Sequence, residues 1–459
     1  MHSEGLTNVV AATDWVGRPN VFYTENRFSL RFNDLVEDDF TWDAAGLYNY
    51  LDWGFSVFER TPVAGIKFLP PNADLVRGPN GKLFARPRPE PDWLTILHTP
   101  TRPDDVLHLL HTTIRNWESS VKGEIVLPLS GGYDSRLIGT MLAEPSRVMA
   151  FSYGAAFRQE RSKETVVARE IAKRLGIGWR QVELGDYHRY FDEWHALFGA
   201  ATHAHGMYHM EFYRKVAEST RGPLASGLVG DAWAGKTFPP VHSPAQLSRL
   251  KLTHGMHADV RAFNAPKPKQ MPQNEFFQRH ETLLKDARYN VVAAVRLKMT
   301  LLQYLEEVPR ALGFAPFSPL CTLEAATAML ALPQELRKNR TWQTDFFRAK
   351  ELLPENDGLK FDRRNDLIRT AWNRIVPRPL SEAALADVVR PEYVRKINRV
   401  IARPPGFLRY HFFQNAMRLA ARYGKSLPNP YNTVYFAYLT LHPLDIIARK
   451  RRSARFLSP

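Results

Sequence analysis

The pattern of apolar and polar positions divides the chain into two parts. Over residues 1–104, apolar and polar residues alternate in short stretches such as 21–23 and 28–32, which is typical of β-strands joined by turns. One segment with helical spacing, 43–53, interrupts them. The stretch 78–92 is rich in Pro, Gly and Arg, and it predicts a hairpin followed by a linker. We therefore expect a smaller β-rich domain over residues 1–104.

From residue 105 onward, helical patterns alternate with short apolar runs. Helical spacing predicts helices over 104–119, 135–143 and 163–175, and the apolar runs predict buried strands over 123–129, 147–153 and 179–184. Strand, helix, strand, helix, strand is typical of an α/β fold with a parallel sheet and right-handed crossovers. The chain is mostly helical from about residue 289. We therefore expect one α/β domain with a helical C-terminal part over residues 105–459.

Charge indicates the kind of partner only loosely. Lysine and arginine number 62, and aspartate and glutamate number 47, so the net charge is +15. Such an excess favours anionic partners, for example nucleotides, nucleic acid, acidic sugars or a membrane face. Much of it lies in the C-terminal region, as at 449–452, where a solvated basic face explains it as well as a docking surface does.

Cysteine usage and apolar segments indicate the compartment. Cys321 is the only cysteine, which excludes a disulfide framework and a cysteine-based zinc cluster and fits a reducing environment. Residues 1–8 lack the pattern of a secretory signal. The apolar segment 434–447 is interrupted by His442 and Pro443 and falls short of the roughly 20 residues that span a bilayer. We expect a cytoplasmic protein without a transmembrane segment.

The residues with the clearest chemistry lie where the first buried strand should turn into a helix. The sequence there is Leu129-Ser130-Gly131-Gly132-Tyr133-Asp134-Ser135-Arg136. A phosphate at such a turn meets backbone N–H groups and the positive end of the helix. The glycines permit a close approach that a Cβ would block, the serines offer hydroxyl donors, and Asp134 offers a carboxylate to Mg²⁺. The glycine spacing differs from that of a Walker loop.

This loop resembles the Ser-Gly-Gly-x-Asp-Ser motif of PP-loop ATP pyrophosphatases. Further segments resemble the asparagine-synthetase-like enzymes within that group, which are amide-forming ligases. They are Phe68–Pro71, which is similar to the end of the family's glutaminase domain, Phe151–Gly154, the helix with Glu164 to Ala172, Ser226–Gly235, Ala315–Phe317 and Leu332–Leu336. The resemblance covers most of residues 44 to 355. It implies a parallel-sheet, HUP-like synthetase domain after a degenerate glutaminase-like domain.

The resemblance also implies roles for individual residues. ATP and Mg²⁺ would be the cofactors, with Asp134 and Asp231 as ligands of the magnesium ion and Lys236 as a neutralising charge. The remaining nucleotide-binding positions, including backbone groups that receive adenine, would be Leu129, Ser130, Gly131, Gly132, Ser135, Ser152, Tyr153, Ser226 and Gly227.

Departures from the family pattern bear on the reaction. A glutaminase of this class needs Cys directly after the initiator Met, where this sequence has His2, and Cys321 lies in an apolar stretch typical of a core. Glutamine hydrolysis is therefore not expected. Leu228 stands where asparagine synthetase carries an acidic residue, and Thr344 replaces an expected lysine. ATP binding is still expected, whereas aspartate as the substrate does not follow.

Two further groups have competing interpretations. His203, His205 and His209 lie where the family places part of its acceptor pocket, so two of them could bind substrate or take part in acid–base steps. Structural histidines are the favoured alternative, and no carboxylate or thiol cluster accompanies them as in a metal site. Arg340, Trp342 and Arg348 could meet the nucleotide or an acidic acceptor, but a solvated arginine face is equally compatible.

The leading hypothesis is an amide ligase that forms AMP and pyrophosphate. A small-molecule or peptide carboxylate would be adenylated and then transferred to ammonia or an amine, and a partner protein or a homodimer is compatible with this chemistry. Asparagine synthesis from ammonia is a narrower version. Another PP-loop reaction, such as RNA modification, is an alternative. The sequence lacks the paired cysteines and the RNA module that would support it, so nucleic acid is not the expected partner. A non-catalytic nucleotide-binding partner protein is the third alternative.

Overall fold

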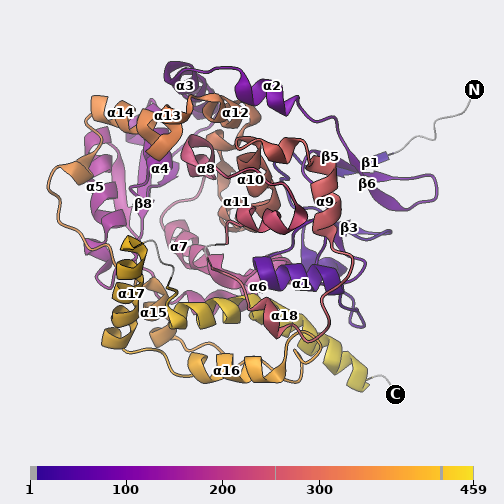
Figure 1. The fold of residues 1–459 in the computed structure, drawn as a ribbon. Coiled ribbons are helices and arrows are strands. Elements are labelled where there is room, and N and C mark those ends of the chain that lie inside the picture. Colours follow the sequence, from indigo (N-terminus) through magenta and orange to yellow (C-terminus); the bar gives the residue numbers. More distant parts are fainter. Residues whose placement is uncertain (1–7, 254, 424–426, 458–459) are drawn as a thin grey trace, which may run out of the picture.

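A parallel sheet of five short strands organises the larger part of the chain (Figure 1). A computed structural model describes residues 8–253, 255–423 and 427–457. The strands of the sheet are β7 (Ile125–Pro128), β8 (Val148–Ser152), β9 (Gly178–Gln181), β10 (Pro223–Ala225) and β11 (Ala315–Phe317). Their order is β11-β10-β7-β8-β9, and every neighbouring pair is parallel. The expected α/β fold with a parallel sheet is confirmed.

The strand order changes direction at β7. From β7 the chain moves outward to β8 and β9, and it then returns to add β10 and β11 on the opposite side. In open α/β sheets, ligands bind beyond the carboxyl ends of the strands at such a switch point. A ligand site is therefore expected at the segments that follow β7, β8 and β10.

Alternate residues of the central strands face two different hydrophobic clusters. Ile125 and Leu127 of β7 belong to one cluster, whereas Val126 between them belongs to the other. This alternation with a period of two is the geometry of a strand that is buried on both faces. The helices α3, α4, α5, α10 and α12 contribute to the first cluster, and α1, α6, α7, α15, α16 and α18 contribute to the second.

Helices cover both faces of the sheet (Figure 1). The helices up to β11 are α1 (Ala44–Trp53), α2 (Trp93–His98), α3 (Pro103–Ser120), α4 (Tyr133–Met141), α5 (Lys163–Leu175), α6 (Phe191–Phe198), α7 (Tyr208–Ala217), α8 (Gly230–Gly235), α9 (Pro272–His280), α10 (Tyr289–Leu302) and α11 (Tyr304–Ala311). After β11 follow α12 (Leu323–Ala331), α13 (Gln334–Arg337), α14 (Thr341–Ala349), α15 (Leu367–Arg374), α16 (Pro391–Ile401), α17 (Phe407–Arg422) and α18 (Pro430–Leu457).

The described residues from 8 to 100 include two small antiparallel sheets and the two helices α1 and α2. One sheet contains β1 (Asn8–Ala12), β5 (Ala73–Arg77) and β6 (Leu83–Pro87), and the other contains β2 (Phe22–Tyr23), β3 (Phe28–Ser29) and β4 (Lys67–Phe68). The hairpin from β5 to β6 agrees with the turn residues expected from position 78. The helix α1 begins after Asp43, whose side chain accepts a hydrogen bond from the Gly46 amide at 2.8 Å.

The N-terminal region shares its apolar residues with the α/β part of the chain. Trp53 and Phe55 pack in the same cluster as Ile125, and Phe22 and Phe32 pack in the same cluster as Val126. A third, smaller cluster is confined to the N-terminal strands and their neighbours. The division into domains at residues 104 and 105 stays a prediction.

Several element boundaries differ from the expected ones. The strand expected over 28–32 ends at Ser29, because Phe32 begins a 3-10 turn that buries its ring completely. The third strand of the parallel sheet spans Gly178–Gln181 rather than 179–184. The helix after the glycine loop begins at Tyr133, two residues earlier than expected, since Gly132 already has the extended conformation of an N-cap residue.

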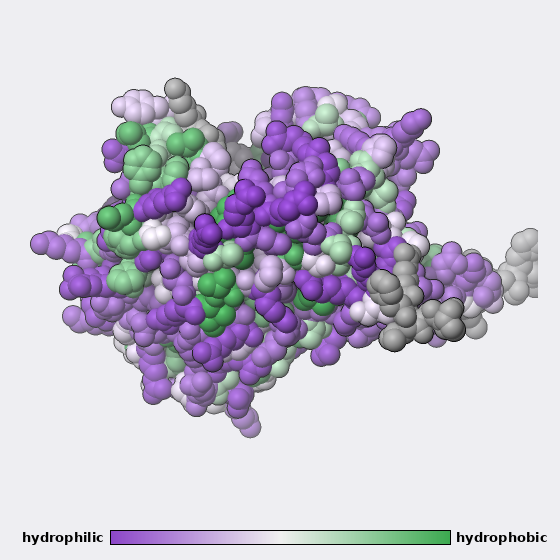
Figure 2. All heavy atoms as spheres, turned by 90° about the horizontal axis from the view of Figure 1, so that it is seen from below, coloured by the Kyte–Doolittle hydropathy of each residue, from purple (hydrophilic) through white to green (hydrophobic). Residues whose placement is uncertain are grey.

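The apolar segment 434–447 belongs to the protein core. It lies within α18, where Tyr435, Tyr438 and Leu441 are fully buried in the second cluster. Among the described residues, no helix is long and apolar enough to cross a membrane. The face of the molecule in Figure 2 is mostly hydrophilic, with apolar side chains gathered in small patches.

Candidate active site

The glycine loop connects the buried strand β7 to the N-terminus of α4. Gly131 has φ of +71°, a left-handed conformation that favours glycine, and an added Cβ would lie only 3.1 Å from Val167. Local hydrogen bonds shape the turn: the Gly132 amide donates to Ser130 Oγ at 3.3 Å, and the Ser130 amide donates to Ser135 Oγ at 3.4 Å. The loop thus places two serine hydroxyls beside the positive end of a helix.

Arg136 anchors this loop from behind. Its guanidinium is fully buried, and it donates to the carbonyl oxygens of Gly131 at 2.7 Å and Leu352 at 2.6 Å. It also forms an ion pair with Glu355 at 3.0 Å. Because these partners are carbonyl and carboxylate oxygens around the loop, Arg136 acts as a structural support for the phosphate-facing turn.

Asp134 and Asp231 lie together although they are far apart in the sequence. The Asp134 Oδ2 atom accepts a hydrogen bond of 2.8 Å from the Asp231 amide, which is in the first turn of α8. Three covalent bonds separate that amide nitrogen from the Asp231 carboxylate carbon, so this carbon lies within about 7 Å of Asp134 Oδ2. Glycine is needed at position 230, because a Cβ there would lie 2.4 Å from Leu320 and 2.8 Å from Asp134 Cγ.

Two cationic side chains accompany these carboxylates. Lys236 Nζ is 3.4 Å from Asp231 Oδ2, and Arg340 Nη1 is 3.7 Å from Asp134 Oδ1. The Arg340 guanidinium also lies over the Tyr133 ring, 4.7 Å from its centre. We call Asp134, Asp231, Lys236 and Arg340 the charged end of the site.

Asp134 sits in an environment that disfavours its negative charge. Its side chain is 19% exposed, and burial, together with the nearby negative charge of Asp231, raises the pKa of Asp134 to about 7. Arg340 and Lys236 only partly offset these effects. Its Oδ1 atom is buried and accepts no hydrogen bond. Such a carboxylate fits a divalent cation, since a cation would supply the missing partner and favour the ionised form.

The end of β8 contributes the next part of the site. The Ser152 hydroxyl donates to the Leu129 carbonyl at 2.5 Å and accepts from Trp179 Nε1 at 3.0 Å, which ties β8 to the start of the glycine loop. Glu164 of α5 accepts a hydrogen bond from Ser162. Burial raises the pKa of the Tyr153 hydroxyl well above its usual range, so this residue stays neutral.

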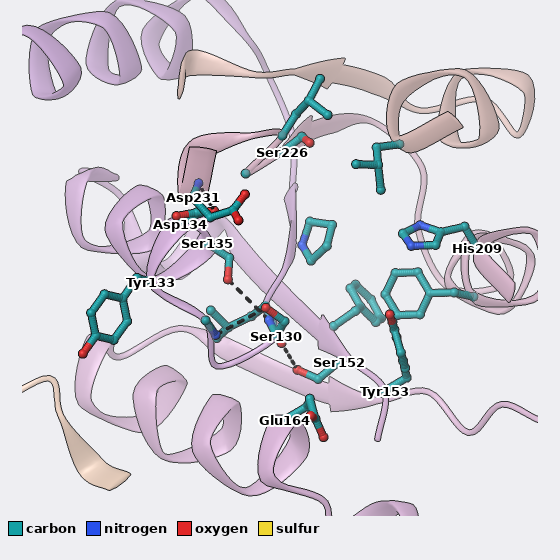
Figure 3. A pocket seen from close by; sticks show the side chains of 18 of the residues that line it. Ser130, Tyr133, Asp134, Ser135, Ser152, Tyr153, Glu164, His209, Ser226 and Asp231 are labelled. Carbon is teal, nitrogen blue, oxygen red and sulfur yellow. Dashed lines mark hydrogen bonds between the residues drawn. The ribbon is translucent and has the colours of Figure 1, made fainter. Parts of the chain in front are cut away.

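These segments surround a cavity of about 380 Å³ (Figure 3). Of the residues expected from the sequence, those that line it are Leu129, Ser130, Gly132, Asp134, Ser135, Ser152, Tyr153, Ser226, Gly227 and Asp231. Gly131 and Lys236 do not line the cavity, but Gly131 shapes the loop and Lys236 pairs with Asp231. The structure thus brings together segments that follow β7, β8 and β10, at the switch point of the sheet.

Part of the lining was not expected from the sequence. Phe212 and Tyr213 of α7 and Leu305 of α11 face the cavity together with His209. We call His209, Phe212, Tyr213 and Leu305 the neutral wall. In Figure 3, His209 and Tyr153 lie on one side of the cavity, and Asp134 and Asp231 lie on the other. The spacing 209, 212 and 213 places three residues on one face of a helix, which was the signal available in the sequence.

The three histidines have separate environments. His209 lines the cavity, and burial lowers its pKa to about 3, so its ring is neutral near pH 7. His203 is buried, and its Nδ1 accepts a hydrogen bond from the His205 amide. The described residues contain no group of three or more His, Cys, Asp or Glu side chains arranged to hold a metal ion.

The other expected candidates are placed as follows. Arg340 lines the cavity, whereas Trp342 is buried and donates to the Ala234 carbonyl at 3.1 Å. Arg348 is exposed and pairs with Asp345 at 2.6 Å, away from the cavity lining. Thr344 lies 3.2 Å from the Tyr133 hydroxyl.

The expectation that the chain does not hydrolyse glutamine depends on two residues, Cys321 and His2. Cys321 is a core residue, as expected, and burial is the largest cause that raises the pKa of its thiol to about 12. A thiol with this pKa is almost entirely protonated near pH 7 and is a poor nucleophile. His2 lies outside the described residues.

Comparison with protein families agrees with the geometry of the site. Residues 119–222 match the family model of asparagine synthase, a segment that begins in α3 and ends just before β10. The match includes the glycine loop, the end of β8 and the whole of α7. A comparison with curated protein sequences found no match.

Proposed function

We propose, from the match of residues 119–222 to the asparagine synthase family model, that this chain is an ATP-dependent amide ligase that forms AMP and pyrophosphate. The observation that carries the proposal is the contact between Asp134 and the Asp231 amide beside the glycine loop. It gathers two carboxylates next to a phosphate-binding turn, which is the arrangement that a magnesium–pyrophosphate group requires.

The first step activates a carboxylate. One oxygen of the substrate carboxylate attacks the α-phosphorus of ATP, the bond from that phosphorus to the bridging oxygen breaks, and pyrophosphate leaves with the electron pair. The attack is resisted because both reactants are negatively charged. Donors and cations that are already in place where charge develops lower this barrier.

Each part of the cavity has a role in this step. The Ser130 and Ser135 hydroxyls and the Gly132 amide hold the departing pyrophosphate at the N-terminus of α4. Asp134 and Asp231 would hold Mg²⁺, which when bound would screen the phosphate charge. Lys236 and Arg340 add positive charge at the same end. The backbone at Ser152 and Tyr153 receives the adenine, and Ser226 and Gly227 border the phosphates from β10.

The second step forms the amide. The nitrogen of ammonia or of an amine attacks the acyl carbon of the acyl-adenylate, AMP leaves with the bonding electrons, and the nitrogen loses a proton. The cavity encloses the adenylate and limits its reaction with water.

We propose that this chain does not take its nitrogen from glutamine. The only cysteine in the sequence, Cys321, is buried, and burial is the largest cause that raises the pKa of its thiol to about 12. A cytoplasmic location is part of the proposal, since ATP and an unpaired cysteine fit a reducing compartment. Glutamate release from glutamine by the purified chain would contradict the proposed nitrogen source, with free ammonia as the positive control.

Incubation of the protein with ATP, Mg²⁺, ammonia and a panel of carboxylates, followed by assay of AMP and pyrophosphate, tests the reaction. We expect carboxylate-dependent release of both products in equal amounts. ADP and phosphate as products would contradict cleavage between the α- and β-phosphates. Tight ATP binding without any product would instead favour a non-catalytic nucleotide-binding partner protein, and AMP formation that depends on RNA would favour RNA modification.

A further inference from the structure

The helix α17 turns polar side chains inward. Tyr410, His411 and Gln414 are buried. Gln414 Nε2 donates to the Asn365 carbonyl at 2.6 Å, and His411 Nε2 lies 2.9 Å from an oxygen of the buried Asp366 carboxylate. Hydrogen bonds and an ionic contact thus attach α17 to the rest of the protein on this side, where a surface helix normally buries apolar residues.

The outer face of α17 carries large apolar side chains instead. Leu408, Phe412 and Leu419 share one face of the helix and are 83%, 67% and 54% exposed. Tyr423, directly after the helix on the same face, is 75% exposed. We call these four residues the α17 stripe. Of the fourteen large hydrophobic residues that are exposed in the described chain, seven lie between positions 407 and 427, so this is the main apolar patch of that surface. Figure 2 shows apolar side chains gathered at the left, the side on which α17 lies in Figure 1.

The charges that accompany the α17 stripe are all positive. The helix contains Arg409, Arg418 and Arg422, and the sequence has neither Asp nor Glu from position 393 to position 444. Arg418 donates to the Arg363 carbonyl at 3.0 Å, and Arg409 lies over the Tyr431 ring. These contacts do not neutralise the two guanidinium charges, so the helix presents both cations and apolar groups to its surroundings.

A basic groove of about 600 Å³ adjoins the first turn of α17, where Phe407 lines it. Four cations from the loop after β8 and from segment 360–364 line the same groove: Arg158, Arg161, Lys360 and Arg364. Acidic neighbours are fewer, namely Asp362 in the lining and Glu160 beside Arg161. Phe157, 58% exposed, packs its ring 6.0 Å from the Phe407 ring. The groove and the α17 stripe therefore form one positively charged surface with exposed apolar side chains.

The charge and shape of this surface indicate what covers it. Apolar side chains at such exposure favour a partner that removes them from water. A second copy of the chain would bring the same arginines together, which like charges resist. A folded protein would have to supply pockets for Leu408 and Phe412, whereas a fluid lipid layer accepts protruding side chains without matching pockets. Anionic head groups also supply the missing negative charge along the whole helix.

We infer that this chain binds the surface of an anionic lipid bilayer through α17. The α17 stripe inserts between the acyl chains, and the flanking arginines and the basic groove contact the head groups. The helix lies at the edge of the molecule in Figure 1, where a flat layer can reach it. This inference is independent of the proposed ligase reaction.

Sedimentation with vesicles tests the binding. The full chain is mixed with vesicles of phosphatidylcholine alone, or of phosphatidylcholine with one third phosphatidylglycerol. We expect the partition into the anionic vesicles to be at least about tenfold greater, and to fall as salt is added, because ions screen the head groups. Equal partition into both kinds of vesicle, or no binding to either, would overturn the inference.

A matched pair of leucine variants tests the α17 stripe. Leu408→Ser should lower the partition into anionic vesicles about tenfold, the loss expected when one leucine no longer leaves water. The control is Leu30→Ser, because Leu30 is 57% exposed and follows β3, on the opposite side of Figure 1 from α17. Phe412→Ser should reproduce the effect of Leu408→Ser. Equal partition of Leu408→Ser, Phe412→Ser and Leu30→Ser would overturn the assignment of α17 to the bilayer.

A pair of arginine variants tests the charge. Arg422→Gln should weaken the partition about fivefold, and the difference from the wild type should shrink with salt, since a single cation near an anionic surface contributes a modest, screened attraction. Arg31→Gln, at an exposed position next to Leu30, should leave the partition unchanged. Equal losses in the two variants would mean that net charge alone attracts the vesicles, which would contradict a surface at α17.

Two further measurements distinguish other occupants. Binding of poly-L-glutamate but not of anionic vesicles, lost in Leu408→Ser, would assign α17 to an acidic polypeptide and overturn the inference. A dimer in sedimentation equilibrium that dissociates in Leu408→Ser would assign α17 to a second copy, with the same consequence. Pyrophosphate release without vesicles should be equal in the wild type and in Leu408→Ser, so the ligase reaction and the bilayer binding can fail separately.

Discussion

The charged end and the neutral wall line the same cavity, yet they treat charge in opposite ways. At the charged end, Asp134 and Asp231 lie together even though the negative charge of Asp231 disfavours the ionisation of Asp134, and two cationic side chains lie beside them. Along the neutral wall, the charged side chains of α7 and α11 pair with groups outside the cavity lining. The charged end can hold a charged ligand that binds and dissociates, and the neutral wall can hold an uncharged group.

The two parts of the cavity also differ in how they affect the stability of the folded protein. A buried carboxylate such as Asp134 destabilises the fold unless it gains a partner, so its presence is best explained by a ligand. The neutral wall buries no charge, although His209 Nδ1 is buried without a hydrogen-bond partner, and it is equally compatible with simple packing. Variants at the charged end should therefore affect the reaction strongly, and variants at the wall should mainly affect selection and stability.

The largest effect is expected at the two aspartates. Asp134→Asn and Asp231→Asn should each lower ATP-dependent pyrophosphate release by about 100-fold, because a lost carboxylate leaves transition-state charge unscreened. The fold should persist, since Asn accepts the Asp231 amide hydrogen bond about as well as Asp does and Asp231 is 51% exposed. Turnover and thermal melting of the purified variants measure both points.

A matched control for these variants is Asp345→Asn. Asp345 is 55% exposed and pairs with Arg348 one helical turn away, so its loss should leave turnover unchanged. Near-normal turnover of Asp134→Asn would show that Asp134 serves only to cap α8, and the charged end would lose its proposed role.

Arg340→Gln should have the next largest effect. Its guanidinium is 3.7 Å from Asp134 and 34% exposed, so it contributes a partly screened charge to the phosphates. We expect the KM for ATP to rise about tenfold, a change of about 1.4 kcal/mol, with a smaller change in kcat. Arg348→Gln is the matched control, because Arg348 is exposed and does not line the cavity. Equal KM values for the two variants would mean that the charge of Arg340 does not contribute to ATP binding.

Local sequence determined the parts of the site that one segment can build alone. The glycine pair after an apolar run predicted the strand, loop and helix at β7 and α4. In the structure the strand is shorter, Ile125–Pro128 instead of 123–129, and the helix is shifted to Tyr133–Met141 instead of 135–143. The alternation of Ile125, Val126 and Leu127 between two clusters is likewise a local property of a buried strand.

Contacts between segments that are distant in the sequence could not be predicted from local patterns. Leu305 meets α7 only because α11 packs against it, and no local pattern distinguishes a leucine that lines a cavity from one in the core. Arg340 and Arg348 looked equivalent in the sequence, and only packing around Tyr133 brings Arg340 to the cavity. Phe32 was assigned to a strand because its alternation is correct, although a 3-10 turn buries it equally well.

The neutral wall makes stability depend on pH. The folded protein holds His209 with a pKa of about 3, whereas an unfolded chain titrates near 6.5, so the unfolded state binds more protons between these values. The free energy of unfolding should therefore fall as the pH falls from about 6.5. His209→Leu should reduce the loss between pH 7 and pH 5 by about 1 kcal/mol, since part of the ring faces the cavity.

Urea denaturation of the wild type and of His209→Leu at both pH values measures this difference. His188, which is buried in the second cluster and has its pKa lowered to about 4, titrates in both proteins and cancels from the comparison. An identical loss in the two proteins would mean that His209 charges freely, and the wall would then be able to accept anionic groups.

The smallest effect is expected at Lys236, the least constrained member of the charged end. Lys236 Nζ is 3.4 Å from Asp231 and 31% exposed, and ion pairs with this much solvent contribute about 0–1 kcal/mol. Lys236→Met should therefore lower pyrophosphate release by about threefold, and the loss should shrink as salt is added, because ions screen an exposed charge. Lys350→Met, at an exposed position outside the cavity lining, should leave the rate unchanged at every salt concentration. A loss as large as that of Asp134→Asn, and insensitive to salt, would instead mean that Lys236 contacts the reacting phosphates directly.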